Sequence, residues 1–180
     1  MRFAIQAGVR KSAKVLMRLG LAMVVVLAIA VLLLRVTGYR VGVDVQRLIG
    51  QPACMPSLVY LWSKHDGNPP RHGDFIVASM PKTVFGVGAR EGDRIVKLVK
   101  GIPGDRVRIQ GTELWINGEH TDRMWLAKSL PGKTVGDYDV DVVLGEKEFF
   151  VMGTTQESFD SRYWGPINRD AIIGKARPLF

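Results

Sequence analysis

The sequence is poor in the residues that form disulfides and metal sites. Cys54 is its only cysteine among 180 residues, so no internal disulfide can form. The three histidines, His65, His72 and His120, lie apart in the sequence, and no group of His, Cys, Asp and Glu has the spacing of metal ligands. We expect no metal and no other cofactor. Cys54 is then a small buried side chain, an intermolecular disulfide partner or a reactive thiol.

Acidic residues are absent from the first part of the chain. The first one is Asp44, whereas basic residues stand at five earlier positions, namely Arg2, Arg10, Lys11, Lys14 and Arg18. Most of the formal net charge of +8 therefore belongs to this end of the chain. A folded domain with a basic surface is not indicated, and we expect no nucleic-acid partner.

A long apolar run follows the basic residues. Residues 19–34 read LGLAMVVVLAIAVLLL and would form a helix about 24 Å long, which residues 15–17 and Val36 extend toward the membrane core of about 30 Å. A buried core helix is rarely apolar on every face. The cleavage site of a signal peptide follows its apolar run, whereas the small-x-small triplet at residues 28–30 lies inside this one. The run is therefore interpreted as an uncleaved membrane anchor.

The basic flank of this run sets the expected orientation. Positive charge before a membrane span tends to stay in the cytoplasm, so the remainder of the chain is exported. We expect a basic cytoplasmic N-terminus at residues 1–18, a single transmembrane anchor at 19–35, a linker at 36–50 and an exported domain at 51–180.

The exported part has the pattern of an antiparallel β domain. No long 3.6-residue periodicity follows Tyr39, and turn residues such as Asn117-Gly118 separate short β-rich runs. These runs are residues 75–77, 93–99, 106–109, 114–116 and 149–151. Residues 64–71 and 127–141 are expected to be exposed loops. The predicted fold class is mainly β, behind one N-terminal helix.

Two polar features of this domain indicate chemistry. If residues 94–100 form a strand, Lys97 shares a face with Ile95 and Val99, and Lys100 lies on the other face. A lysine on an apolar face either extends its amine to water or, when kept from water, can act as a base; the pattern does not choose between the two lysines. Residues 153–165 form either a functional loop or an ordinary polar turn held by an Asp160–Arg162 pair.

Three segments resemble the signature sequences of bacterial type I signal peptidases, the membrane-bound Ser/Lys endopeptidases. The lysine signature of that family is Lys-Arg-x-x-Gly-x-Pro-Gly-Asp, and residues 97–105, KLVKGIPGD, differ from it only at Leu98. The final signature is Ser-x-Asp-Ser-Arg-Tyr-x-Gly, which residues 158–165, SFDSRYWG, match. Residues 73–77, GDFIV, resemble the Gly-Asp-hydrophobic signature between them. The resemblance extends from about residue 40 to the end.

The nucleophile segment departs from the family pattern. Signal peptidases have Ser-Met-x-Pro-Thr-Leu, whereas related conjugative-transfer peptidases that process pilin subunits have Ser-x-Pro followed by Gly-x-Tyr. Residues 54–60, CMPSLVY, resemble the shorter form, with Cys54 in the place of serine and Leu58 in that of glycine. The short segment between the lysine and final signatures is also similar to the conjugative branch. Residues 153–157, GTTQE, replace the usual Gly-Asp-Asn-Arg-Asp stretch.

The resemblance implies a role for each matched residue. Cys54 would attack the scissile carbonyl, Lys97 would be the base, and Ser158 would orient the lysine amine. Asp160 and Arg162 would support the loop as an ion pair. The Cys54 amide would be one oxyanion donor, and a second would come from elsewhere, since proline stands at position 52, where some signal peptidases have a hydroxyl donor.

The implied function is a membrane-bound endopeptidase with a Cys/Lys dyad on the periplasmic face of the bacterial inner membrane. Its partners would be inner-membrane lipid and exported precursor proteins, in particular pilin-like subunits, and a thioester intermediate would also allow peptide joining. The alternative is an inactive signal-peptidase-like binding or assembly factor. Retention of Lys97 on an apolar face argues against lost activity, because a lysine that has no function there would only lower the stability of the fold. A DNA-binding repressor of the related self-cleaving fold is opposed by the membrane anchor.

Overall fold

The computed structural model describes residues 2–50, 53–64, 67–82 and 90–179, with side chains from residue 14 onward. The chain divides into two compact units, Met1–Arg40 and Val41–Phe180. Pro52 and His65, both considered above, lie outside the described residues.

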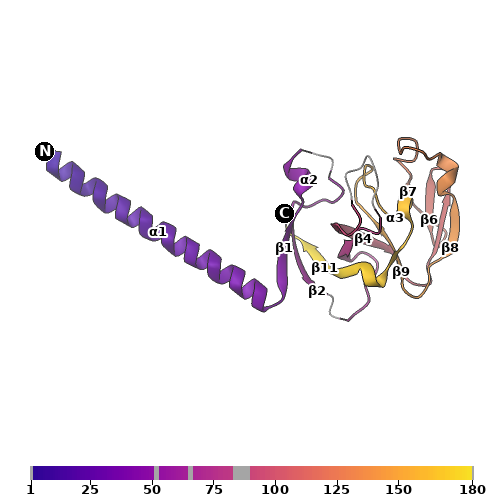
Figure 1. Ribbon diagram of the computed structural model, residues 1–180, viewed down its shortest axis with the longest axis horizontal. Helices are drawn as coiled ribbons and strands as arrows, with labels where there is room; N and C mark the ends of the chain where they lie inside the picture. The colour runs from indigo at the N-terminus through magenta and orange to yellow at the C-terminus, as the bar shows by residue number, and fades with distance from the viewer. Residues whose placement is uncertain (1, 51–52, 65–66, 83–89, 180) are drawn as a thin grey trace. The chain divides into compact units, whose positions relative to one another are not determined.

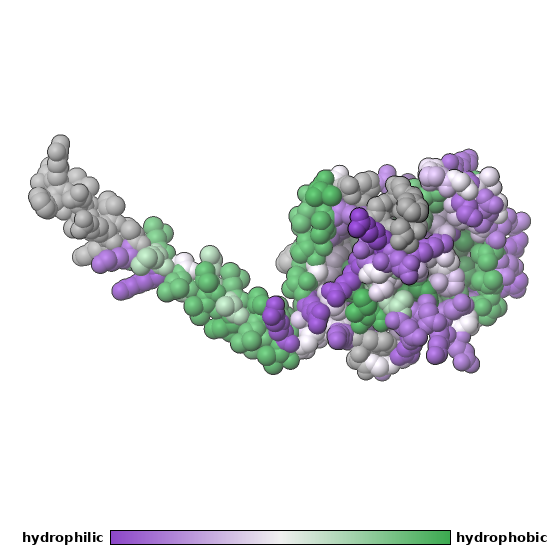
Figure 2. Space-filling view, viewed as in Figure 1, coloured by the Kyte–Doolittle hydropathy of each residue, from purple (hydrophilic) through white to green (hydrophobic). Residues whose placement is uncertain are grey.

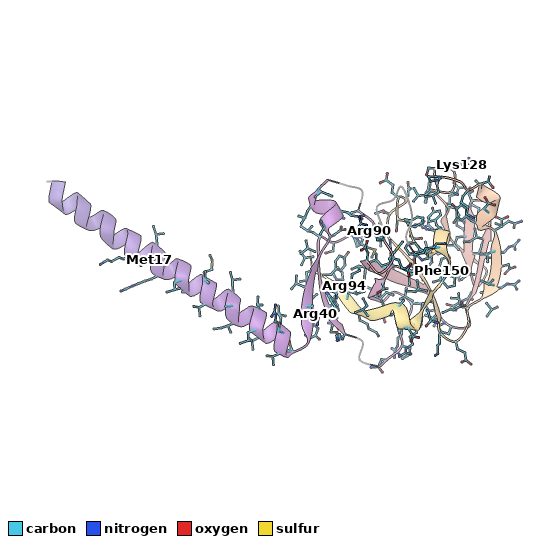
Figure 3. The ribbon with its side chains drawn as sticks, viewed as in Figure 1. Met17, Arg40, Arg90, Arg94, Lys128 and Phe150 are labelled. Atoms are coloured by element: carbon cyan, nitrogen blue, oxygen red, sulfur yellow. The ribbon has the colours of Figure 1, made fainter. Side chains whose placement is uncertain are left out.

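The first unit consists mainly of helix α1 (Arg2–Val36) (Figure 1). Its segment Lys14–Val36 has a mean hydropathy of 2.8 and no buried residues, and it is the one helix in the described part of the chain that is long and apolar enough to cross a membrane. Apolar side chains cover most of the visible surface of this segment, with hydrophilic ones toward its two ends (Figure 2), and Met17 projects away from the helix (Figure 3). The expected apolar N-terminal helix is thus confirmed.

The second unit contains two antiparallel sheets, which confirms the mainly β class. The larger sheet has the strand order β1-β2-β11-β3-β4-β9-β10, and the smaller has the order β7-β6-β5-β8 (Figure 1). The strands of the larger sheet are β1 (Tyr39–Val43), β2 (Val59–Lys64), β3 (Phe75–Ser79), β4 (Arg94–Gly101), β9 (Glu148–Met152), β10 (Ile167–Asn168) and β11 (Ile172–Pro178). Those of the smaller sheet are β5 (Arg106–Gln110), β6 (Glu113–Ile116), β7 (Glu119–Arg123) and β8 (Val140–Val143).

The helical elements of this unit are short. Two are α-helices, α2 (Val45–Leu48) and α3 (Ser161–Trp164), and two are 3-10 turns, η1 (Val135–Tyr138) and η2 (Arg169–Ala171). Asp44 caps α2 by accepting a hydrogen bond from the Arg47 N–H at 3.3 Å. Exposed apolar side chains lie on α2 at Val45 and Leu48 (Figure 2). Residues 36–50, expected as a linker, therefore contain β1 and α2.

Burial along the strands follows their place in the sheets. In β5 the buried residues Val107 and Ile109 alternate with exposed ones, as expected for a strand with one face on the core. The central strands β3 and β9 bury side chains on both faces instead. Phe150, labelled in Figure 3, packs in the core cluster that joins β9 to β5 and β6. This shared cluster holds the two sheets together.

A polar junction also connects the sheets, centred on the carboxylate of Asp105 between β4 and β5. The Ile102 N–H donates to Oδ2 at 2.7 Å, and His72 Nε2 lies 2.6 Å from the same oxygen. Asn117 Nδ2 donates to Oδ1 at 2.8 Å from the turn between β6 and β7. Burial alone would raise the pKa of Asp105, but the hydrogen bonds from Asn117 and Ile102 and the nearby His72 lower it.

All five strand segments expected from the sequence lie in strands of the structure, except that β4 begins at Arg94, one residue after the expected start. Asn117 and Gly118 form the turn between β6 and β7 with φ of 53° and 84°, the positive values that a two-residue hairpin turn requires. The expectation of a loop over residues 127–141 is wrong in part, since this range includes η1 and the start of β8. Val140 pairs with Ile109 of β5, and a distant partner of this kind leaves no signal in the local sequence.

Candidate active site

Lys97 is buried in the middle of strand β4, opposite Ile76 of β3. The residue is 3% exposed, and Nζ donates a hydrogen bond to Ser158 Oγ at 2.9 Å. The Trp164 ring lies nearby, with its centroid 5.8 Å from Nζ. Lys100 is only half-buried and lines a separate cleft of about 330 Å³ with His72 and Glu119. The two lysines left open by the sequence pattern are thus in different surroundings, and only Lys97 contacts the polar loop 153–165.

Cys54 lies in the turn that leads into β2, and its side chain is half-buried. It packs against a core cluster that includes Met55 and Tyr60. Its carbonyl oxygen accepts a hydrogen bond from the Thr154 N–H at 2.8 Å. The backbone of Cys54 is therefore attached to the loop that carries Ser158.

Gly153 makes this attachment possible because it has no side chain. A Cβ at this position would lie 2.0 Å from Ser158 Oγ and 2.5 Å from the Cys54 carbonyl oxygen, closer than real contacts allow. The two groups thus meet at the α-carbon of Gly153, and Ser158 Oγ in turn accepts from Lys97 Nζ. In this way the structure brings together the backbone of Cys54, Ser158 and the amine of Lys97.

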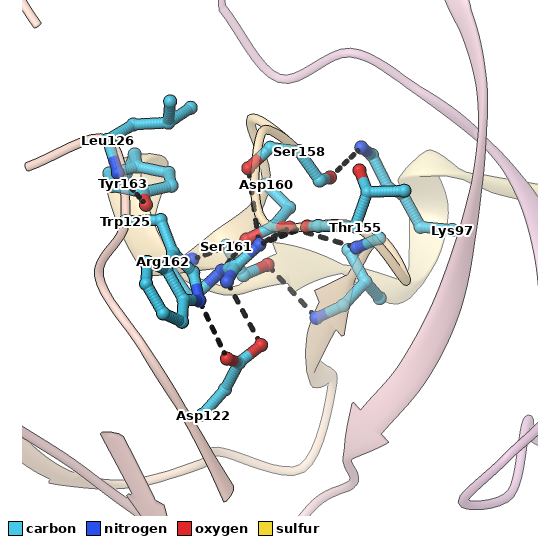
Figure 4. A network of polar contacts seen from close by, with 12 residues as sticks. Lys97, Asp122, Trp125, Leu126, Thr155, Ser158, Asp160, Ser161, Arg162 and Tyr163 are labelled. Carbon is cyan, nitrogen blue, oxygen red and sulfur yellow. Dashed lines mark hydrogen bonds and ion pairs between the residues drawn. The ribbon is translucent and has the colours of Figure 1, made fainter. Parts of the chain in front are cut away.

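A buried ion pair organises the same loop (Figure 4). The side chains of Asp160 and Arg162 are both 0% exposed, and Arg162 Nη2 and Nε donate to Asp160 at 2.7 and 2.8 Å. Asp160 Oδ2 also accepts from the Gly153 N–H at 2.9 Å, and Arg162 Nη2 donates to the Ser158 carbonyl at 3.2 Å. Burial alone would lower the pKa of Arg162, but the hydrogen bond and charge of Asp160 raise it above its usual value.

The network reaches the smaller sheet through partners that the sequence did not indicate. Arg162 Nη1 donates to Asp122 Oδ2 at 3.0 Å (Figure 4). It also donates to the Arg123 carbonyl at 3.0 Å. The Tyr163 hydroxyl accepts from the Leu126 N–H at 2.9 Å, and burial raises the pKa of Tyr163 to about 12. Asp122 lies 40 residues from Arg162 in the sequence, so no local spacing could have identified the pair.

Other candidate residues have structural contacts. The hydroxyl of Ser57, the nearest serine to Cys54 in the sequence, donates to the Val59 carbonyl at 2.8 Å. His72 contacts Asp105, as described above, and His120 Nε2 lies 2.7 Å from Glu113 Oε2.

Comparison with known proteins identifies the family. The family model described as "Signal peptidase, peptidase S26" matches residues 16–180. The chain is 32% identical over 110 residues to signal peptidase I of Leptolyngbya laminosa, and the aligned region covers 61% of this chain and 52% of that protein. It is 33% identical over 97 residues to signal peptidase I of Bacillus caldolyticus, and here the aligned region covers 48% of this chain and 53% of that protein. The chain thus spans about half the length of these curated relatives.

A solved structure is also similar. The crystal structure of a signal peptidase I from Enterococcus faecalis V583 is 25% identical, with a TM-score of 0.38, over 63% of this chain and 98% of that one. On the family match, which includes nearly the whole chain, this protein belongs to the signal peptidase family, peptidase S26.

Loss of Arg162 is expected to destabilise the protein strongly. Arg162→Met leaves the buried Asp160 carboxylate unpaired, which should lower the free energy of unfolding by about 3–5 kcal/mol. The matched control is Arg106→Met, because Arg106 forms an ion pair with Asp141 that is largely exposed. That change should lower the free energy of unfolding far less, because water screens an exposed ion pair. Urea unfolding of the full chain in detergent, followed by tryptophan fluorescence, measures both. Equal losses would contradict the role assigned to the buried pair.

Proposed function

We propose that this chain is a membrane-bound endopeptidase that processes exported precursor proteins with a Cys54/Lys97 dyad. The observation that carries this proposal is the buried Lys97–Ser158 hydrogen bond, which lies against the Cys54 backbone at Gly153. The family match and the two specific signatures support the same reaction class. A lysine amine that is shielded from water and hydrogen-bonded to a hydroxyl group is suited to accept and return a proton.

In the first half of the proposed reaction, Cys54 Sγ attacks the scissile carbonyl of the precursor. The thiol proton passes to the Lys97 amine, and the carbonyl oxygen becomes an oxyanion that the Cys54 N–H stabilises. When the tetrahedral intermediate collapses, Lys97 returns the proton to the departing amine, and an acyl thioester remains on Cys54. Ser158 would keep the lysine amine directed toward the reacting atoms.

In the second half, a nucleophile releases the thioester. Water gives up a proton to Lys97, attacks the acyl carbon and regenerates the Cys54 thiol, leaving a free carboxylate on the product. An amine can attack in the same way, and thioesters react with amines more readily than oxygen esters do. The N-terminal amine of the same substrate chain would then form a peptide bond and a cyclic product, without any further reactant.

The proposed location follows from the anchor and the family. Residues 1–18 would lie in the cytoplasm, residues 19–35 would span the bacterial inner membrane, and residues 36–50 would connect to a periplasmic catalytic domain at residues 51–180. Substrate and enzyme would then be held at one membrane surface, which raises their effective concentration. Pilin-like subunits of a conjugation system are the proposed substrates, because the nucleophile segment is similar to the conjugative branch.

Replacement of Cys54 tests the nucleophile. Cys54→Ala should reduce precursor processing by about 10³-fold or more, because the attacking atom is lost. Cys54→Ser should keep measurable activity, since Lys97 can also accept the proton of a serine hydroxyl. Mass spectrometry of exported small proteins from cells with the wild-type or variant gene measures processing and also identifies the substrate.

Ser57→Ala is the control for this experiment, because the Ser57 hydroxyl is engaged with the Val59 carbonyl. Its processing should remain close to that of the wild type. Normal processing by Cys54→Ala would contradict the proposed mechanism. Unchanged exported proteins after deletion of the whole gene would favour the inactive binding or assembly factor instead.

Replacement of each of the two lysines by arginine tests which of them is the base. Lys97→Arg should lower processing by about 10²–10⁴-fold, because arginine does not give up its proton at working pH. Lys100→Arg should be tolerated, since Lys100 is half-buried beside a different cleft. Both variants are compared by the rate at which the identified precursor disappears. An active Lys97→Arg variant, or equal loss in both, would overturn the assignment.

The mature substrate shows whether peptide joining occurs. A cyclised product is lighter by one water molecule than the linear chain of the same residues, and it has no free N-terminus. We expect a cyclic form to be present, and intact-mass measurement with N-terminal sequencing detects it. A wholly linear product would reject joining and leave the peptidase proposal in place.

A further inference from the structure

Three consecutive carbonyl groups of the nucleophile segment accept hydrogen bonds from side chains or amides elsewhere in the fold. Thr155 Oγ1 donates to the Ala53 carbonyl at 2.9 Å, and the Thr154 N–H donates to the Cys54 carbonyl at 2.8 Å. Arg47 Nη2, from α2, donates to the Met55 carbonyl at 2.8 Å. The backbone of this turn is therefore fixed from outside at each residue.

The bond from Thr155 has a particular effect because a peptide group is planar. The carbonyl of Ala53 and the N–H of Cys54 belong to one trans peptide plane and point in opposite directions. A side chain that fixes the direction of the Ala53 carbonyl therefore fixes the direction of the Cys54 N–H. That N–H is the proposed oxyanion donor, and an oxyanion donor is effective only when it is oriented before the reaction.

Thr155 itself is held in place by the surrounding loop. Its carbonyl lies 3.5 Å from Arg162 Nη2, and the neighbouring Thr154 is bonded to Cys54. The side chain is half-buried and 102 residues away from Ala53 in the sequence. Thr155 also lies in the stretch GTTQE, where this sequence differs from the family pattern.

We propose that Thr155 is a positioning residue that orients the Cys54 N–H toward the oxyanion by holding the Ala53 carbonyl. This inference rests on the proposed role of Cys54 as the nucleophile. It assigns to Thr155 an effect on reactions that pass through an oxyanion, and no direct contact with the reacting atoms. The rate of a reaction in which the same sulfur attacks without forming an oxyanion should then not depend on the Thr155 hydroxyl.

Two probes of Cys54 separate these cases, and both use the full chain in detergent. With p-nitrophenyl acetate, Sγ attacks the acetyl carbonyl through an oxyanion, p-nitrophenolate departs with its electron pair, and the thiol proton is lost to Lys97. With iodoacetamide, Sγ displaces iodide from a CH₂ group, the thiol proton is again lost to Lys97, and no oxyanion forms. Because Cys54 is the only cysteine, labelling by iodoacetamide reports on this thiol alone.

Thr155→Val, which removes the hydroxyl and keeps the branched shape, should slow Cys54 acylation by about tenfold or more. Alkylation by iodoacetamide should stay within about twofold of the wild type, because the sulfur and its surroundings are unchanged. Thr155→Ser should restore acylation. If Thr155→Val folds poorly, Thr155→Ala provides the same comparison. Thr121→Val is the matched control, since the Thr121 hydroxyl also donates to a backbone carbonyl, that of Glu119, but on β7.

The outcomes distinguish this inference from the function on which it rests. Wild-type acylation by Thr155→Val would reject the positioning role, and so would an equal fall in acylation and alkylation, which indicates a displaced or loosened segment. A fall in acylation that Thr155→Ser does not restore would also reject it. If Cys54→Ala is acylated as fast as the wild type, Cys54 is not the nucleophile, and the proposed function fails together with the inference.

Discussion

The buried Asp160–Arg162 pair is the interaction on which the arrangement of the site depends. Neither side chain is exposed, so each charge must be compensated inside the protein. Most of their hydrogen bonds go to the loop itself, and Arg162 Nη1 also reaches strand β7. The carboxylate holds the Gly153 N–H, and the guanidinium holds the Ser158 carbonyl. Gly153 and Ser158 are the residues that meet the Cys54 backbone and the Lys97 amine. A charge pair that takes no part in the proposed chemistry thus helps to fix the loop that contacts the proposed nucleophile and base.

Alternation along the chain predicted five strands that lie inside the sheets, but it missed the sheet edges and the two inner strands β2 and β11. The buried face of β4 could be read from Ile95 and Val99, and the burial of Lys97 agrees with that pattern. The strands at the sheet edges, β1, β10, β7 and β8, were all missed. They are either very short or mostly exposed, so hydrophobic periodicity gives little sign of them. Their pairing depends on distant partners that only the folded chain reveals.

The same limit applied to the site. The signature residues could be identified from the sequence because each signature is a short, continuous stretch. The pair of Asp160 and Arg162 is also local and could be expected. The contacts of Arg162 with Asp122 and of Thr155 with Ala53 join segments far apart in the chain, and no local spacing predicts them. The sequence thus indicated the candidate residues, whereas the structure was needed to show what holds them in place.

The lysine signature begins with Lys97 and ends with Asp105. The contacts of Asp105 give it a structural role, which differs from the role proposed for Lys97. Its carboxylate binds Ile102 and His72 beside the larger sheet and Asn117 of the smaller one. A single continuous motif therefore contains both the proposed base and a contact that joins the two sheets. The lowered pKa of Asp105 means that the folded state favours the charged carboxylate. That contribution to stability is present above the ordinary carboxyl pKa of about 3.9 and is lost as the pH falls through the lower value of the folded protein. Acid would therefore weaken this contact between the sheets, at the opposite end of the motif from the amine proposed as the base.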